Sequence, residues 1–120
     1  MNKVILSGYI ATDLELKHTQ NSVAVCSFRL GVRRTKGEYD FYTIVCWKTN
    51  AEFLTQHFSK GDGIEVAGRL ITRYWDDKTT GKKRSAVEIT AENIDFGKSK
   101  GSPEAEQMTE PPKIDDDLPF

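Results

Sequence analysis

The sequence predicts an all-β fold over residues 1–97, built as a small five-stranded barrel, and three observations support this. Those residues contain no proline, because all four prolines lie within the last eighteen positions of the 120. They are rich in Val, Ile, Thr and aromatic residues. Polar clusters interrupt the apolar runs about every ten residues, which is typical of small barrels and sandwiches. The length suits one domain.

The charges divide the chain into two parts. Residues 1–97 hold 14 basic and 12 acidic side chains, a net +2, whereas residues 98–120 hold 3 and 6, a net −3. The first part is therefore a mildly basic domain. Residues 98–113 have too few apolar side chains to offset the entropy of ordering, so we predict a disordered linker there and an acidic tip at residues 114–120.

The N-terminal apolar run indicates where the protein works. Val4 to Leu6 is too short for a signal peptide core or a membrane span, so we expect a soluble, cytoplasmic protein. Cys26 and Cys46 lack C-x-x-C spacing and sit in apolar runs. We therefore interpret them as reduced thiols of the core.

The first strands follow from alternation. Lys3 to Ile10 is predicted as a strand, and residues 14–19 alternate again before a turn at residues 20–22. From Val23 to Arg33 every even position is apolar and the odd face shows Ser27, Arg29, Gly31 and Arg33, which predicts a strand with its even face buried. After a turn at residues 34–38, Tyr39 to Lys48 returns, and a hairpin closing near residue 36 would place the two cysteines opposite each other.

A short helix is predicted to follow. Thr49 and Glu52 have the spacing of a capping box, in which a hydroxyl and a carboxylate satisfy the free amides of a helix start. The helix is expected to run to about Ser59. Its apolar stripe consists of Ala51, Leu54 and Phe58, and Gly61 is expected to stop it.

The last two strands complete the barrel. Gly63 to Trp75 alternates, with Gly68 marking a sharp bend or a close backbone approach. A charged loop over residues 76–84 leads to a strand from Ala86 to Phe96, whose buried face is predicted to carry Val87, Ile89 and Ala91. This order, with the helix between the third and fourth strands, fits a five-stranded Greek-key barrel of the OB type, which binds oligonucleotides or oligosaccharides on one face.

The non-core faces of these strands carry rings and guanidinium groups together. Guanidinium groups attract phosphates, and exposed rings let unpaired bases stack at about 1–3 kcal/mol per base. A duplex hides its base faces, so the pattern predicts a groove for single strands with little sequence preference. The alternative is that the rings pack under a loop or at a subunit interface. The residues concerned are Arg29, Arg33, Phe41, Trp47, Arg69, Arg73 and Trp75.

The loop residues Lys82 and Lys83, followed by Arg84, are a weaker candidate. They could contact phosphates, since Trp75 begins the same hairpin, or could be an ordinary solvated charge run. Gly81-Lys82 lacks the other residues of a phosphate-binding P-loop. We found no catalytic serine elbow and no metal-ligand spacing around His18 or His57, so we expect neither an enzyme nor a cofactor.

The last residues combine acidic and apolar side chains. Three carboxylates precede a proline-stiffened hydrophobic end, which a partner could capture in an apolar pocket beside a basic group. A solvated acidic end without a partner is the alternative. The predicted partner-binding residues are Asp115, Asp116, Asp117, Leu118, Pro119 and Phe120.

Four segments together resemble the bacterial single-stranded DNA-binding protein family: Met1 to Leu6 with Gly8, Asp40 to Trp47, Lys60 to Trp75, and Asp115 to Phe120. The resemblance implies an OB-fold that assembles as a homotetramer, wraps single-stranded DNA in the bacterial nucleoid, and recruits replication, repair and recombination enzymes through residues 115–120. It also implies stacking roles for Phe41, Trp47 and Trp75 and groove positions for the four arginines.

Departures from the family lie in the segment between Arg33 and Phe41, which is shorter than usual, and in Leu118, where the family commonly has Ile. Two rival functions remain from the sequence. One is an OB-fold adaptor of a replication-restart complex, and the other is a small barrel that binds structured RNA.

Overall fold

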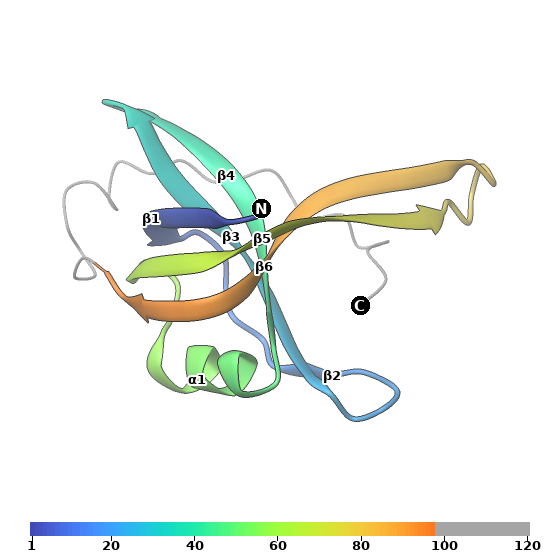
Figure 1. Ribbon diagram of the computed structural model, residues 1–120, viewed down its shortest axis with the longest axis horizontal. Helices are drawn as coiled ribbons and strands as arrows, with labels where there is room; N and C mark the ends of the chain where they lie inside the picture. Colours follow the sequence, from blue (N-terminus) through green and yellow to red (C-terminus); the bar gives the residue numbers. More distant parts are fainter. Residues whose placement is uncertain (98–120) are drawn as a thin grey trace.

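The computed structural model describes residues 1–97, so the predictions for residues 98–113 and 114–120 lie outside the described residues. The described chain forms strands and one helix (Figure 1). In order they are β1 (Val4–Ile10), β2 (Lys17–His18), β3 (Ala24–Thr35), β4 (Glu38–Trp47), α1 (Thr49–His57), β5 (Gly63–Asp76) and β6 (Lys83–Phe96).

The strands close into a barrel, as predicted. Neighbours in the sheet follow the order β1-β5-β6-β4-β3-β2, and β1 pairs with β3 as well, which joins the two ends. All pairs are antiparallel except β4 and β6, which run parallel through Ile44↔Ile89 and Val45↔Thr90. Five strands form the barrel, and α1 lies between the third and fourth of them. Residues 14–19 contribute only the two-residue strand β2 on the edge of β3.

Glycine allows the barrel to close tightly. A Cβ atom on Gly8 would lie 2.2 Å from the carbonyl oxygen of Gly31, where β1 crosses β3, and one on Gly68 would lie 2.1 Å from that of Thr90. The pairing of β5 and β6 shifts register between Ala67 and Gly68. The predicted bend at Gly68 is confirmed as a bulge where the backbones approach closely.

The β3–β4 hairpin has the predicted register. Cys26 pairs with Cys46, and Thr35 pairs with Glu38 across a turn in which Gly37 takes a φ of 81°. The even positions of β3 from Ala24 to Val32 face the core, and both cysteines are buried and free. The largest fully buried side chains are Phe28, Ile10, Leu30, Ile44, Leu54 and Ile64.

The helix packs its predicted stripe of Ala51, Leu54 and Phe58 into the core and ends close to the predicted Ser59, but its N-cap was predicted wrongly. Lys48, not Thr49, is the N-cap, and no side chain caps the helix. The amide of Glu52 donates to the Lys48 carbonyl (3.1 Å), because the Lys48 amide is still tied to Ala24 in β3 (2.8 Å) and the helix begins at once. The helix ends at His57, before Gly61, whose φ is 95°.

A two-stranded arm extends beyond the barrel. Figure 1 shows the loop end of β5 and the start of β6 reaching away from the other strands. The predicted burial of Val87 is therefore wrong: it is 63% exposed, whereas Ile89 and Ala91, farther along β6, are buried. Tyr74 is exposed on the same arm. Within residues 1–97, no helix is long and apolar enough to cross a membrane.

Candidate nucleic-acid interface

One face of the sheet gathers the ring and arginine residues that the sequence singled out. Across β3 and β4, Arg29 pairs with Thr43 and Arg33 with Tyr39, while Phe41 lies opposite Gly31. Because residues paired across two strands share a face, and because alternation returns to that face every second residue, Trp47 lies on it as well.

The β5–β6 pair continues the same face. Arg69 pairs with Thr90, Arg73 with Ala86, and Trp75 with Arg84. Thr90 in turn pairs with Val45 of β4, which shares the face of Trp47. The closure of β4 on β6 therefore joins the two halves into one surface. The surface includes the seven strand residues predicted to bind DNA, and it is called the interface below.

The three rings of the interface lie outside the core. Phe41, Trp47 and Trp75 are each partly exposed, and none belongs to the hydrophobic core cluster. The core side chains Ile44 and Cys46 project from the opposite face of β4. The rings are thus placed on an outer surface, where a ligand can reach part of each.

Each indole has a guanidinium group above it. The Cζ atom of Arg73 lies 5.7 Å from the centroid of the Trp47 ring, and that of Arg84 lies 5.7 Å from the centroid of Trp75. Both distances fall within the range of cation–π attraction. The sequence offered Arg84 only as the end of the charge run from Lys82, with phosphate contact or solvation as its two alternatives. The β5–β6 register, which pairs it with Trp75, is the signal that places it beside a ring.

The structure separates Lys83 from the rings. Lys83 pairs with Asp76, one position from the pair of Trp75 and Arg84, so it projects from the other face of the arm. Lys82 lies in the loop before β6, where its carbonyl accepts a hydrogen bond from the Asp77 amide (2.8 Å). Lys83 thus lies outside the interface and Lys82 lies in the loop at the end of the arm, while the predicted DNA contacts of both lysines stay predictions.

Asp77 organises that loop. Its carboxylate accepts hydrogen bonds from the amides of Thr79 (2.8 Å) and Thr80 (3.3 Å), and the Arg84 guanidinium lies 3.5 Å away. These hydrogen bonds, with the charge of Arg84, hold the pKa of Asp77 below its usual value. The Arg84 guanidinium therefore lies near both the Asp77 carboxylate and the Trp75 ring.

A buried carboxylate lies within this basic surface. Glu88 is 1% exposed, and its Oε1 accepts a hydrogen bond from the Nε–H of Arg73. Burial raises the pKa of Glu88, and the hydrogen bond and charge of Arg73 oppose that rise. Sequence reasoning missed Glu88, because an acidic residue on an outer strand face ordinarily points into water.

Buried polar atoms without a hydrogen bond gather on the interface. Within residues 1–97 they are the Nε of Arg29, the Nε1 of Trp75 and the Oε2 of Glu88, and all three residues face the same way. Burial also lowers the pKa of Arg29. Leaving such buried groups without a hydrogen bond is costly.

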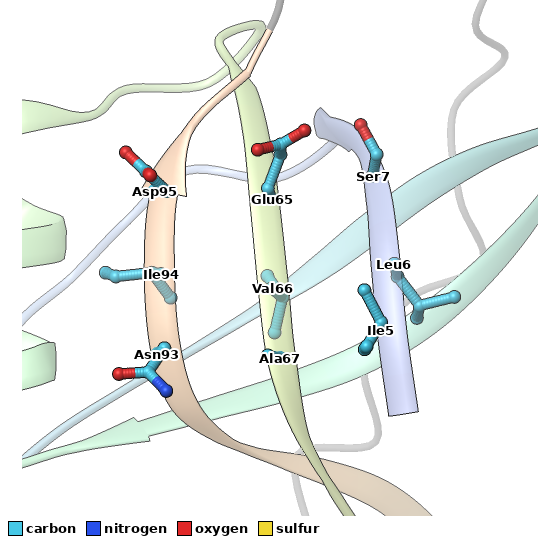
Figure 2. A pocket seen from close by; sticks show the side chains of 9 residues that line it. All are labelled: Ile5, Leu6, Ser7, Glu65, Val66, Ala67, Asn93, Ile94 and Asp95. Carbon is cyan, nitrogen blue, oxygen red and sulfur yellow. The ribbon is translucent and has the colours of Figure 1, made fainter. Parts of the chain in front are cut away.

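A hollow of about 400 Å³ lies elsewhere, on the outside of β1, β5 and β6 (Figure 2). Figure 2 shows the carboxylates of Glu65 and Asp95 near one end and the apolar Ile5 and Ala67 near the other. No basic side chain is among its lining residues. Two carboxylates repel phosphate groups, so this hollow does not suit a nucleic-acid backbone.

Comparisons with known proteins agree with the geometry. The model of the single-strand binding protein family matches residues 1–97. The chain is 37% identical over 113 residues to the single-stranded DNA-binding protein of Staphylococcus aureus, covering 89% of this chain and 72% of that protein.

Two further relatives have similar names. The single-stranded DNA-binding protein of Streptococcus pneumoniae is 37% identical over 106 residues, which cover 83% of this chain and 67% of that protein. Single-stranded DNA-binding protein 2 of Clostridium acetobutylicum is 38% identical over an alignment of 136 positions that spans all of both chains. With an OB-fold barrel and a family match over every described residue, the chain belongs to the single-strand binding protein family.

Proposed function

We propose that this protein binds single-stranded DNA on the interface, with little sequence preference and without catalysing a reaction. The observation that carries the proposal is the gathering of three partly exposed rings and five arginines on one face of the barrel. The names of its relatives support the same ligand.

Two kinds of contact contribute to the affinity for single-stranded DNA. The rings offer flat surfaces to unpaired bases, and every base has such a face, so stacking tolerates almost any sequence. The arginines attract the phosphate backbone, and binding releases counterions from it, so affinity falls as salt rises. The described domain has a net charge of only +2 and therefore attracts a polyanion weakly. Stacking must then supply much of the affinity.

We further propose a homotetramer that wraps the strand in the bacterial cytoplasm and nucleoid during replication, recombination and repair. Residues 115–120 would recruit the enzymes of these processes, with the apolar end entering a pocket and the three carboxylates meeting basic groups. The family membership of the chain and the composition of its last residues support this part of the proposal.

Tryptophan fluorescence during titration with oligothymidine tests strand binding. We expect quenching that saturates, because bases stack on the indoles. Replacing Trp47 and Trp75 together by Ala is expected to weaken binding by about tenfold or more, given about 1–3 kcal/mol for each stacked base.

Replacing Lys82 and Lys83 together by Gln is the matched control. We expect a smaller loss, because Lys83 projects from the other face of the arm and Lys82 lies in the loop beyond the paired strands. Anisotropy of a labelled oligonucleotide measures both variants on one scale. Absence of quenching by wild-type protein, or a larger loss from the lysine variant, would contradict the proposed arrangement. Competition by an RNA of equal length distinguishes the structured-RNA alternative.

A further inference from the structure

Glu88 is the one charged side chain within residues 1–97 that is buried, and it is buried in the face proposed to bind a polyanion. Its Oε1 accepts from Arg73, and its Oε2 has no hydrogen-bond partner. Arg73 is thus the group that compensates this carboxylate. If charge were the only effect of Glu88, its carboxylate would weaken the binding of phosphate groups to this face.

Arg73 cannot leave Glu88 without cost. To contact a phosphate as an ordinary surface cation, its guanidinium would have to turn outward and abandon the carboxylate. Removing one partner from a buried ion pair leaves an uncompensated charge in a poor solvent, which is strongly unfavourable. The pair is therefore expected to persist when a strand binds.

Arg73 also lies near the Trp47 ring, whose centroid is 5.7 Å from its Cζ atom. The Arg73 side chain is 24% exposed. A planar guanidinium group held above an indole and open in part to solvent resembles the arginine planes on which unpaired bases stack. The ion pair with Glu88 fixes the position of the Arg73 guanidinium group, and the Trp47 ring lies beneath that group.

Arg69 offers a contrast on the same strand. It is exposed, it lies on the same face, and no ion pair within the described residues ties it to a buried acid. It can follow a phosphate without leaving a buried charge behind. The two arginines, four residues apart, are therefore suited to different contacts.

We propose that Glu88 is a positioning residue that holds Arg73 as a flat shelf over Trp47, so that Arg73 supports a stacked base rather than neutralising a phosphate. This inference rests on the proposed binding of single-stranded DNA. It assigns Glu88 a role in binding, and it divides the arginines of the interface into stacking and phosphate-contacting groups.

The salt dependence of binding tests this division. Each phosphate contact adds about 0.7 to the slope of log affinity against log salt for a single strand. The variant Arg73→Gln with Glu88→Gln removes both charges together, so no buried charge is left unpaired. Using the full chain and oligothymidine, we expect its affinity to fall about fivefold or more with an unchanged slope.

Arg69→Gln is the matched control. We expect its slope to become shallower by about 0.7, because it loses a phosphate contact. A similar change of slope in the double variant would overturn the proposal, since Arg73 would then be a phosphate ligand. An unchanged affinity in the double variant would overturn it as well. Thermal unfolding confirms that each variant is folded before its binding is measured.

Arg73→Lys gives a second test that keeps the charge opposite Glu88. An ammonium group pairs with the carboxylate but has no plane for a base. We expect an affinity loss of about fivefold or more at an unchanged slope. Wild-type affinity in this variant would show that charge alone suffices and would overturn the proposal.

The proposed function and this inference fail in different ways. If wild-type protein does not bind oligothymidine, single-stranded DNA binding itself is wrong. If wild-type protein binds and its slope depends on Arg73 as strongly as on Arg69, the interface remains and only the role of Glu88 and Arg73 is wrong.

Discussion

Cys26 and Cys46 show how a cross-strand pair determines the chemistry of single residues. They pair directly between β3 and β4, and both point into the core. Burial, with repulsion from Cys26, raises the pKa of the Cys46 thiol to about 12, and burial also raises the pKa of Cys26. Because the thiolate is the reactive form, both groups are packing residues.

We therefore predict that neither thiol reacts with a thiol-specific reagent in the folded protein near pH 8. With a pKa of about 12 for Cys46, only about one molecule in ten thousand carries its thiolate at that pH. Unfolding returns both groups to ordinary values, so two thiols should then react. Absorbance with Ellman's reagent, with and without denaturant, measures this. Rapid labelling of the native protein would contradict the packing shown here.

The junction of β4 and α1 requires a strained backbone conformation at Lys48. Lys48 has a φ of 56° and a ψ of −127°, a conformation that side chains with a Cβ atom rarely adopt. Its amide donates a hydrogen bond to the carbonyl of Ala24 in β3, while its carbonyl accepts one from the amide of Glu52 in the helix. The turn must therefore be made within one residue, and the residue present is not glycine.

Lys48→Gly is expected to stabilise the protein by about 1 kcal/mol. Relief of backbone strain contributes about 1–3 kcal/mol, and the greater freedom of glycine in the unfolded chain takes back about 0.5–1 kcal/mol. Urea denaturation measures the free energy of unfolding. Thr49→Gly, one residue later in the helix, is the matched control and should destabilise. A destabilised Lys48→Gly variant would show that the lysine side chain matters more than the strain.

Two surfaces of the whole molecule differ in their charged side chains. Arginine and ring residues occupy the interface, while the hollow on β1, β5 and β6 carries Glu65 and Asp95. Residues 98–120 add a net −3 to a described domain of net +2. In the proposed division of labour the domain holds the strand, and the last residues compete with it weakly or capture partner enzymes.

Deleting residues 114–120 should leave affinity for oligothymidine unchanged or slightly higher, because the deletion removes three carboxylates that repel phosphate. Capture of a replication or repair enzyme on immobilised protein should be lost. A variant with Asp115, Asp116 and Asp117 replaced by Asn keeps the length and is the control for charge. A loss of about tenfold or more in strand affinity would contradict this division.

Much of the fold was readable because alternation is a local property. The even positions of β3 from Ala24 to Val32 are apolar, so its buried face and the pairing of Cys26 with Cys46 could be predicted from a hairpin register. The N-cap of the helix could not, because the amide of Lys48 is held by Ala24, a residue distant in sequence. The exposure of Val87 likewise depends on where the barrel ends along β6.

The sequence by itself determined which residues share a face of each strand, since period-two alternation assigns each side chain to one face. It thereby selected the rings and arginines of the interface. Only the tertiary structure decided which of them meet: closure of β4 on β6 joins the two halves of the face, Arg73 comes to lie over Trp47, and Glu88 becomes buried beside it. Contacts between distant strands depend on how the sheet curves and closes, and a local signal such as Gly68 indicates where a strand bends but not which distant side chains then meet.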